Sequence, residues 1–160
     1  MVILVNDFFR NQNKDEQDLY IELLSIIGSL SKLFADSKTP FLYYRAMENI
    51  FCKAFDAVNL SRSDLSVDAS KEGMGIGLKT FLHNNGKTFQ KIAEFNKESY
   101  LLRNLKKDEL IFKVAEMRNE RIDVTKRLCD LNDVVYHLVT RSPYQMNIYE
   151  EPMDTIELNS

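Results

Sequence analysis

The chain has 160 residues, of which 44% are hydrophobic, 28% charged and 11% aromatic, with a formal net charge of −3. These proportions are typical of a globular protein and exclude a collagen-like, linker-dominated or disordered chain. No stretch approaches the roughly 18 apolar residues of a membrane span, and the first residues lack a signal-peptide pattern. Cys52 and Cys129 lack metal-ligand spacing and cannot build a disulfide framework. We therefore expect a single cytoplasmic domain with no membrane partner.

Two helices are predicted in the first third of the chain. The first begins near Asp15, with Asn13 or Asp15 as its cap, and ends at Pro40, because the residue before proline avoids the helical region. Its apolar residues recur at steps of three and four: Leu19, Leu23, Ile26, Leu30 and Leu33. Residues 1–40 form this N-terminal helical segment. The second helix covers about 41–56, and its apolar face carries Tyr44, Met47, Phe51, Ala54 and Phe55.

Strands and helices alternate in the remainder. Residues 64–70 and 75–82 read as two strands joined by a turn, and in the second strand Ile76, Leu78, Thr80 and Leu82 point one way while Gly75, Gly77, Lys79 and Phe81 point the other. Helices are predicted over about 87–105 and 107–128, the latter with Leu110, Val114, Met117 and Ile122 inward. Two strands follow at 134–141 and 144–150. This order predicts an α+β fold, in which helices flank a mixed central sheet of about four strands.

Charge is distributed unevenly along the chain. Residues 79–127 carry 12 Lys+Arg against 7 Asp+Glu, whereas the segments on either side are acidic. A basic block between acidic ends can present a positive face to a polyanion, although solvated helices with surplus lysines would have the same composition. The candidates for DNA contact, with plain solvation as the alternative, are Lys91, Arg118, Asn119, Arg121 and Arg141.

The residues suited to phosphodiester chemistry come from four successive elements. Asp68 ends one strand, and Lys79 lies on its hairpin neighbour, so both can approach over one sheet face. A carboxylate suits Mg²⁺, and a lysine can orient the attacking water beside a phosphate. Glu48 on the preceding helix and Gln90, Lys91 and Glu94 on the following helix are further candidates. The structural alternatives are a strand-end role for Asp68, pairing of Glu48 with Arg45 or Lys53, and surface roles for Gln90 and Lys91.

In their order, these residues resemble the PD-(D/E)XK nuclease superfamily, which has a restriction-endonuclease-like fold. The matching segments are Glu48 in RAMENIF, Asp68 in SVDAS, Lys79 in GIGLKTF, and Gln90 or Lys91 in TFQKIAEF. More narrowly, residues 41–154 resemble a group of bacterial type II restriction endonucleases, with residues 155–160 as a truncated tail. The resemblance implies a Mg²⁺-dependent DNA endonuclease of a restriction system that acts on double-stranded DNA, with homodimerisation left open. Asp68, Glu48 and Glu94 would be the metal ligands.

Gly77 departs from the superfamily pattern, which has a carboxylate two residues before the lysine. Glu94 or Glu72 would have to supply that carboxylate, and Glu94 is the better placed if it shares a helix face with Gln90. Without a replacement, the alternative is a DNA-binding module of the same fold that does not cut. A third hypothesis is a regulatory α+β protein whose basic helices bind an acidic partner. The glycines at 73, 75 and 77 either admit a DNA backbone or mark bulges.

Overall fold

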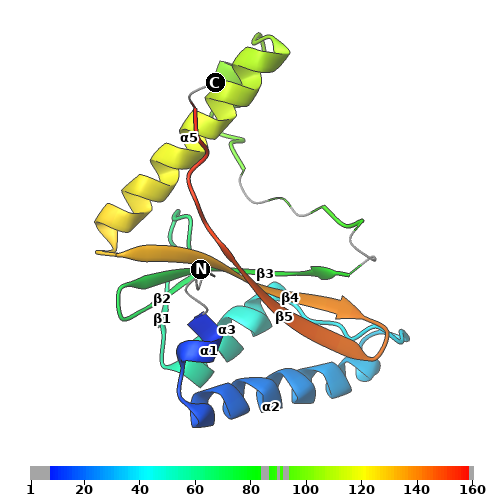
Figure 1. The fold of residues 1–160 in the computed structure, drawn as a ribbon. Helices are drawn as coiled ribbons and strands as arrows, with labels where there is room; N and C mark the ends of the chain where they lie inside the picture. The colour runs from blue at the N-terminus through cyan, green and yellow to red at the C-terminus, as the bar shows by residue number, and fades with distance from the viewer. Residues whose placement is uncertain (1–7, 84–86, 90, 92–93, 159–160) are drawn as a thin grey trace, which may run out of the picture.

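The computed structural model of the protein describes residues 8–83, 87–89, 91 and 94–158. Its elements are α1 (Phe8–Asn11), α2 (Lys14–Leu30), the 3₁₀ helix η1 (Ser31–Leu33), α3 (Tyr44–Phe55), β1 (Val58–Asn59), β2 (Ala69–Lys71), β3 (Met74–Leu82), α4 (Ser99–Leu102), α5 (Lys107–Leu128), β4 (Asp133–Ser142) and β5 (Gln145–Pro152). Helices α2 and α3 lie on one side of the sheet, and α5 lies on the other side and extends beyond it (Figure 1). The α+β class is confirmed.

The sheet has five strands in the order β1-β2-β3-β4-β5. Strands β3 and β4 run parallel and the other neighbours are antiparallel, so the sheet is mixed, as predicted. The parallel pair requires a long crossover, and α5 lies within it. The fifth strand is the short edge strand β1, which the sequence pattern did not indicate. Within the described residues, no helix is long and apolar enough to cross a membrane.

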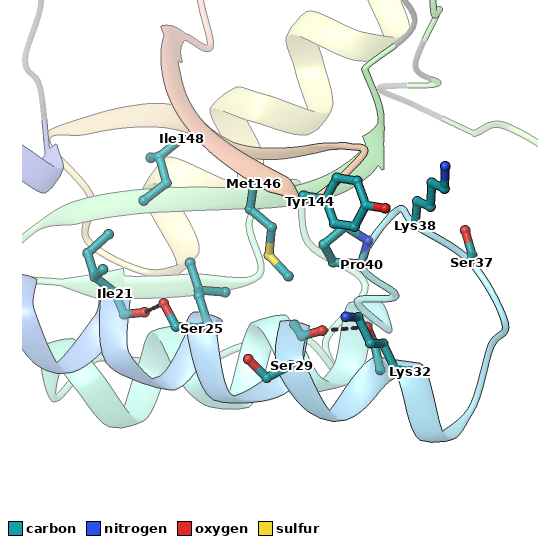
Figure 2. A pocket seen from close by; sticks show the side chains of 13 residues that line it. Ile21, Ser25, Ser29, Lys32, Ser37, Lys38, Pro40, Tyr144, Met146 and Ile148 are labelled. Carbon is teal, nitrogen blue, oxygen red and sulfur yellow. Dashed lines mark hydrogen bonds between the residues drawn. The ribbon is translucent and has the colours of Figure 1, made fainter.

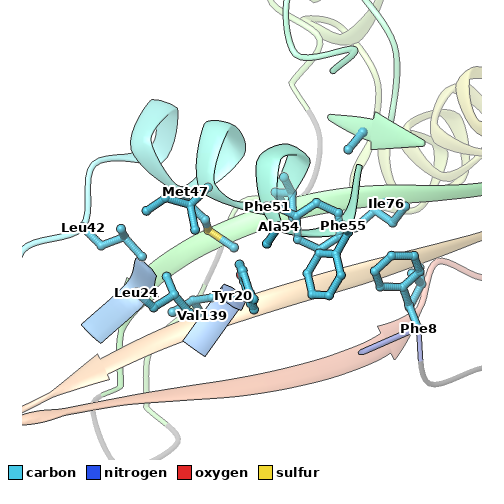
Figure 3. Close-up of a cluster of buried hydrophobic side chains, with 14 residues drawn as sticks. Phe8, Tyr20, Leu24, Leu42, Met47, Phe51, Ala54, Phe55, Ile76 and Val139 are labelled. Atoms are coloured by element: carbon cyan, nitrogen blue, oxygen red, sulfur yellow. The ribbon is translucent and has the colours of Figure 1, made fainter. Parts of the chain in front are cut away.

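The main core lies between the sheet and the pair α2 and α3 (Figure 3). The predicted apolar face of α3 is confirmed for Met47, Phe51, Ala54 and Phe55, which are buried, whereas Tyr44 is exposed. The predicted apolar stripe is only partly confirmed: Leu19 and Leu23 are half-buried and pack against the core, whereas Ile26, Leu30 and Leu33 are exposed. The fully buried residues of α2 are Tyr20 and Leu24. The inward face is displaced because it is centred on Tyr20, whose hydroxyl has a partner inside the core.

That partner is His137 on β4, in a buried polar network. The Tyr20 hydroxyl lies 2.9 Å from His137 Nε2, and His137 Nδ1 lies 2.6 Å from Glu150 Oε1. The backbone N–H of Phe9 donates to both carboxylate oxygens of Glu150, at 3.0 and 3.2 Å. Burial, followed by the charge of Glu150, raises the pKa of Tyr20, so the phenol stays protonated and can donate to the imidazole. The network therefore joins α1, α2, β4 and β5 across the core.

Two predictions for the central region are wrong. Residues 64–68 form a loop, and Asp68 precedes β2 where the sequence suggested that it ends a strand. The helix predicted over 87–105 is not formed: the described residues 87–89, 91 and 94–98 are not helical, and only α4 is. Phe89, which belonged to the expected apolar face of that helix, is 99% exposed. An amphipathic helix gains most of its stability from packing that face, and Phe89 gains no such packing.

Helix α5 has the predicted bounds but a different inward face. Its buried residues are Ala115, Arg118, Ile122 and Thr125, so of the predicted set only Ile122 is buried. Only the C-terminal half of α5 contributes to a second core cluster, in which Ile122 packs with Val67, Leu131, Val134 and Met153. The buried stripe is therefore determined by where the helix crosses the sheet, which its own apolar pattern does not reveal.

Candidate functional site

The candidate site lies on the sheet face opposite α2 and α3. Ala69 pairs with Ile76, and Ile76 and Leu78 are buried toward the helices, so Gly77 and Lys79 face the other way, as predicted. Asp68 Oδ2 accepts hydrogen bonds from the Leu78 N–H at 2.7 Å and from Lys79 Nζ at 3.2 Å. The side chains of Asp68 and Lys79 are 23% and 25% exposed, so solvent and ligands can reach the pair. The predicted approach of this carboxylate and this lysine is confirmed.

A cavity of about 220 Å³ opens beside the Asp68–Lys79 pair. It brings together six of the residues singled out in the sequence: Asp68, Lys79, Lys91, Glu94, Arg118 and Arg121. The remaining lining residues are Leu65, Ser66, Ile122, Tyr136 and Met153. Four cations against two carboxylates leave the charged lining positive, which favours an anion.

The rim of the cavity is a chain of ion pairs. Lys91 Nζ lies 2.7 Å from Glu94 Oε2, and Arg121 Nη1 donates to the Glu94 carbonyl at 3.2 Å. Arg121 Nη2 also lies 2.6 Å from Asp64 Oδ1, and Lys97 lies 3.2 Å from the other oxygen of Asp64. These contacts lower the pKa of Glu94, chiefly through the hydrogen bond from Lys91, and that of Asp64, chiefly through Lys97. These contacts join the segment around Glu94 to α5. The helix that was predicted for this segment is not formed in its described residues.

Arg118 is the deepest cation of the cavity, with 8% of its surface exposed. Its Nη1 donates to the Asp154 carbonyl at 2.7 Å, and Nη2 lies 3.5 Å from the Tyr136 hydroxyl. Its Nε is buried and has no hydrogen-bond partner within the described part of the chain. In that same part no carboxylate lies within ion-pair distance of the guanidinium. A buried, permanently charged group with neutral partners is a strong local source of positive potential.

Glu48 does not join this cavity. It lies on α3, on the other side of the sheet, is 6% exposed, and accepts a hydrogen bond from Arg45 Nη1 at 3.0 Å. The pairing with Arg45 that the sequence left as an alternative is therefore what the structure contains. Glu48 and Asp68 both act on Cys52: burial first, and then these two charges, raise the pKa of the Cys52 thiol to about 11.

Asn119 and Arg141, proposed as DNA contacts, have structural partners. The side-chain amide of Asn119 donates to the Ile156 carbonyl and accepts from the Ile156 N–H, both at 2.8 Å, so it holds the C-terminal segment against α5. Arg141 pairs with Leu82 on the sheet and donates through Nη1 to the Pro40 carbonyl at 3.1 Å, and burial lowers its pKa. Neither residue lines the cavity. Gln90 lies outside the described residues.

Packing explains Gly77, where the superfamily carries a carboxylate. A Cβ there would lie 2.6 Å from Met153 Cε and 3.2 Å from a carbon of the Tyr136 ring. The glycine therefore admits these two side chains onto the strand. The β3–β4 register runs through Gly77 without interruption, so the bulge suggested by the sequence is absent there. Gly73 has a positive φ of 79°, as does Glu72 at 49°, and the two form the tight β2–β3 turn.

The carboxylates do not form a metal site. Glu72 lines a different cavity, and the Glu94 carboxylate is held by Lys91 and Asn96. Asp68 is held by Lys79 and by the backbone. Over residues 8–83, 87–89, 91 and 94–158, no three His, Cys, Asp or Glu side chains gather where they could hold a metal ion. The donors as arranged therefore do not fit the predicted Mg²⁺.

Tyr136 and Met153 are lining residues that the sequence analysis missed. Tyr136 pairs with Gly77 in the parallel β3–β4 ladder, and this register, unlike the strands themselves, has no signal in the local sequence. Comparison with known proteins adds no further residues: the chain matches no protein-family model, no curated protein and no solved structure. The resemblance to the PD-(D/E)XK nucleases therefore rests on the motifs alone.

Proposed function

We propose that this cavity binds a phosphate group of the DNA backbone and that the protein is a DNA-binding module. The observation that supports this most is the buried Arg118 guanidinium, which lines the cavity with no carboxylate partner in the described residues. Burial of an unpaired charge is unfavourable, and a phosphate oxygen would both neutralise it and accept its unused N–H.

The neighbouring charges support the same ligand. Arg118 and Arg121 are three residues apart on α5 and so lie on one face of the helix, and Lys79 reaches the cavity from β3. The cavity volume of about 220 Å³ is below the roughly 300–1,000 Å³ of ordinary small-molecule sites. It suits one phosphate of a larger molecule better than a complete small ligand.

The test is the binding of a fluorescently labelled DNA duplex, measured by anisotropy over a range of salt concentrations. The double variant Lys79→Gln/Lys91→Gln is compared with Lys14→Gln/Lys71→Gln, which removes the same charge elsewhere. The pairs are matched: Lys14 and Lys91 are exposed and bound to nearby acids, and Lys71 and Lys79 are half-buried in ion pairs.

We expect the cavity variant to lower the slope of log affinity against log salt by about 1, because the cavity holds one phosphate and each neutralised phosphate contributes roughly 0.9. The control variant should retain the slope of the unmodified protein. Equal losses in the two variants would show that only net charge matters, and an affinity insensitive to salt would contradict DNA binding altogether.

A second candidate, the Mg²⁺-dependent endonuclease of the resemblance, is favoured by the Asp68–Lys79 pair at 3.2 Å. Asp68 and Glu94 are the residues that would hold the ion, but both are engaged by lysines, so we assign no hydrolytic step to them. The test is nicking of supercoiled plasmid with and without Mg²⁺. Cleavage that Lys79→Ala abolishes, with duplex affinity reduced less than in the double variant, would favour the enzyme over the binding module.

A further inference from the structure

A second cavity, of about 430 Å³, lies on the opposite side of the sheet, between α2, the segment 31–40 and the β4–β5 hairpin (Figure 2). Its floor is apolar and is formed by Ile21 and Leu24 from α2, Met146 and Ile148 from β5, and Pro40. The volume is within the roughly 300–1,000 Å³ of typical small-molecule sites.

The walls of this cavity are joined by two backbone-directed hydrogen bonds. The N–H of Tyr144 at the hairpin tip donates to the Lys38 carbonyl at 2.8 Å, and Arg141 donates to the Pro40 carbonyl at 3.1 Å. Tyr144 has a positive φ of 65°, a conformation that favours glycine, and its ring lines the cavity. The two hydrogen bonds thus hold the hairpin against the segment before α3 and fix this side of the cavity.

Gly28 lies on the wall of the cavity that α2 forms. It lies within α2, where glycine disfavours the helix, and a Cβ there would lie 2.8 Å from Met146 Cε. The absence of a side chain therefore allows Met146 to lie against the helix and form the floor.

The charged lining residues are Lys32 and Lys38, and both are exposed. Neither has an ion pair with any part of the chain that the structure describes. The hydroxyls of Ser25 and Ser31 already donate to helix carbonyls, so they offer little to a polar ligand. An apolar floor with two exposed lysines at its edge, neither in an ion pair with the described residues, is complementary to an apolar body with a single anionic head.

We propose that this cavity binds an anionic amphiphile, with its hydrocarbon body on Ile21, Met146 and Ile148 and its head between Lys32 and Lys38. The site lies on the other face of the sheet from Asp68 and Lys79, so the proposal is independent of DNA binding. Hydrophobic burial supplies most of the affinity, and the lysines select the charge of the head.

The experiment titrates the full chain, labelled at the Ile and Met methyl groups, with octanoate, octyl phosphate, octan-1-ol and acetate, followed by NMR. We expect saturable shifts of the Ile21, Met146 and Ile148 methyls with octanoate or octyl phosphate, and the tighter of the two identifies the head group. Octan-1-ol should bind about tenfold more weakly, because it lacks a charge-assisted hydrogen bond, and acetate should produce no shift.

Three variants locate the site. Lys32→Gln/Lys38→Gln should weaken octanoate binding about tenfold and leave octan-1-ol unaffected, whereas the equally exposed pair Lys14→Gln/Lys53→Gln should change neither. Ser25→Phe, at an exposed position on the cavity wall, should abolish both. The proposal is overturned if neither anion shifts these methyls, or if octanoate binds the Ser25→Phe variant as tightly as the unmodified protein.

Discussion

Removal of Glu150 tests whether the buried polar network stabilises the fold. Its side chain is 4% exposed, and its Oε1 lies 2.6 Å from the fully buried His137 Nδ1. The Phe9 N–H is a second donor, so Glu150→Ala leaves two buried donors without their acceptor. Loss of one member of such a buried pair costs about 3–5 kcal/mol, which is a large part of the roughly 5–15 kcal/mol of a typical domain.

The measurement is urea unfolding followed by circular dichroism. Glu150→Ala should lower the free energy of unfolding by about 3–5 kcal/mol, and Glu150→Gln by about 1.5–3 kcal/mol, because the remaining amide oxygen can accept from one of the two donors. Glu151→Ala, at the exposed neighbour on β5, is the control and should change stability by no more than about 0.5 kcal/mol. A loss below about 1 kcal/mol in Glu150→Ala would refute the energetic role of the network.

Three further predictions concern single side chains. The Cys52 thiol, whose pKa is raised to about 11, should react slowly with iodoacetamide at pH 8, and Asp68→Asn should accelerate the reaction by removing one of the charges that disfavour the thiolate. Asn119→Ala removes two hydrogen bonds to the Ile156 backbone, so amide hydrogen exchange at Ile156 should become faster. Gly75→Ala should lower the free energy of unfolding by about 1–3 kcal/mol, because a Cβ there would lie within 3.1 Å of three packed side chains.

Each of these predictions has a contrary outcome. Equal alkylation rates in Asp68→Asn and in the exposed control Asp64→Asn would show that the carboxylate does not act on the thiol. The neighbouring variant Glu120→Ala is the control and should leave amide exchange at Ile156 unchanged. If Asn119→Ala also leaves it unchanged, the C-terminal segment is held by other contacts. A stabilising Gly75→Ala would mean that the packed side chains yield and that only the entropy of glycine matters.

The candidate site was partly predictable, because part of it depends on local periodicity. A strand alternates with a period of two, so the burial of Ile76 and Leu78 places Lys79 on the opposite face, and a tight turn brings the preceding Asp68 beside it. The helix α5 that carries Arg118 and Arg121 was also predicted, since its capping and length are local properties.

Other parts of the site depended on contacts between residues far apart in the chain. Glu48 was expected to converge with Asp68, but the side of the sheet that α3 covers is decided by packing of its apolar face, which turns Glu48 toward Arg45. The helix expected around Gln90 depended on burial of an apolar face, but Phe89 is exposed and the segment meets α5 through the carbonyl of Glu94.

The sequence by itself determined the α+β class, the main helices and strands, and the strand face that carries Lys79, because these follow from local propensity and from the periods of hydrophobic residues. Tertiary structure alone decided the roles of Gly77 and Arg118. Met153, 76 positions further along the chain, covers the strand at Gly77, and the sheet buries the Arg118 guanidinium at the cavity. Burial and close approach are properties of segments brought together, and no local pattern contains them.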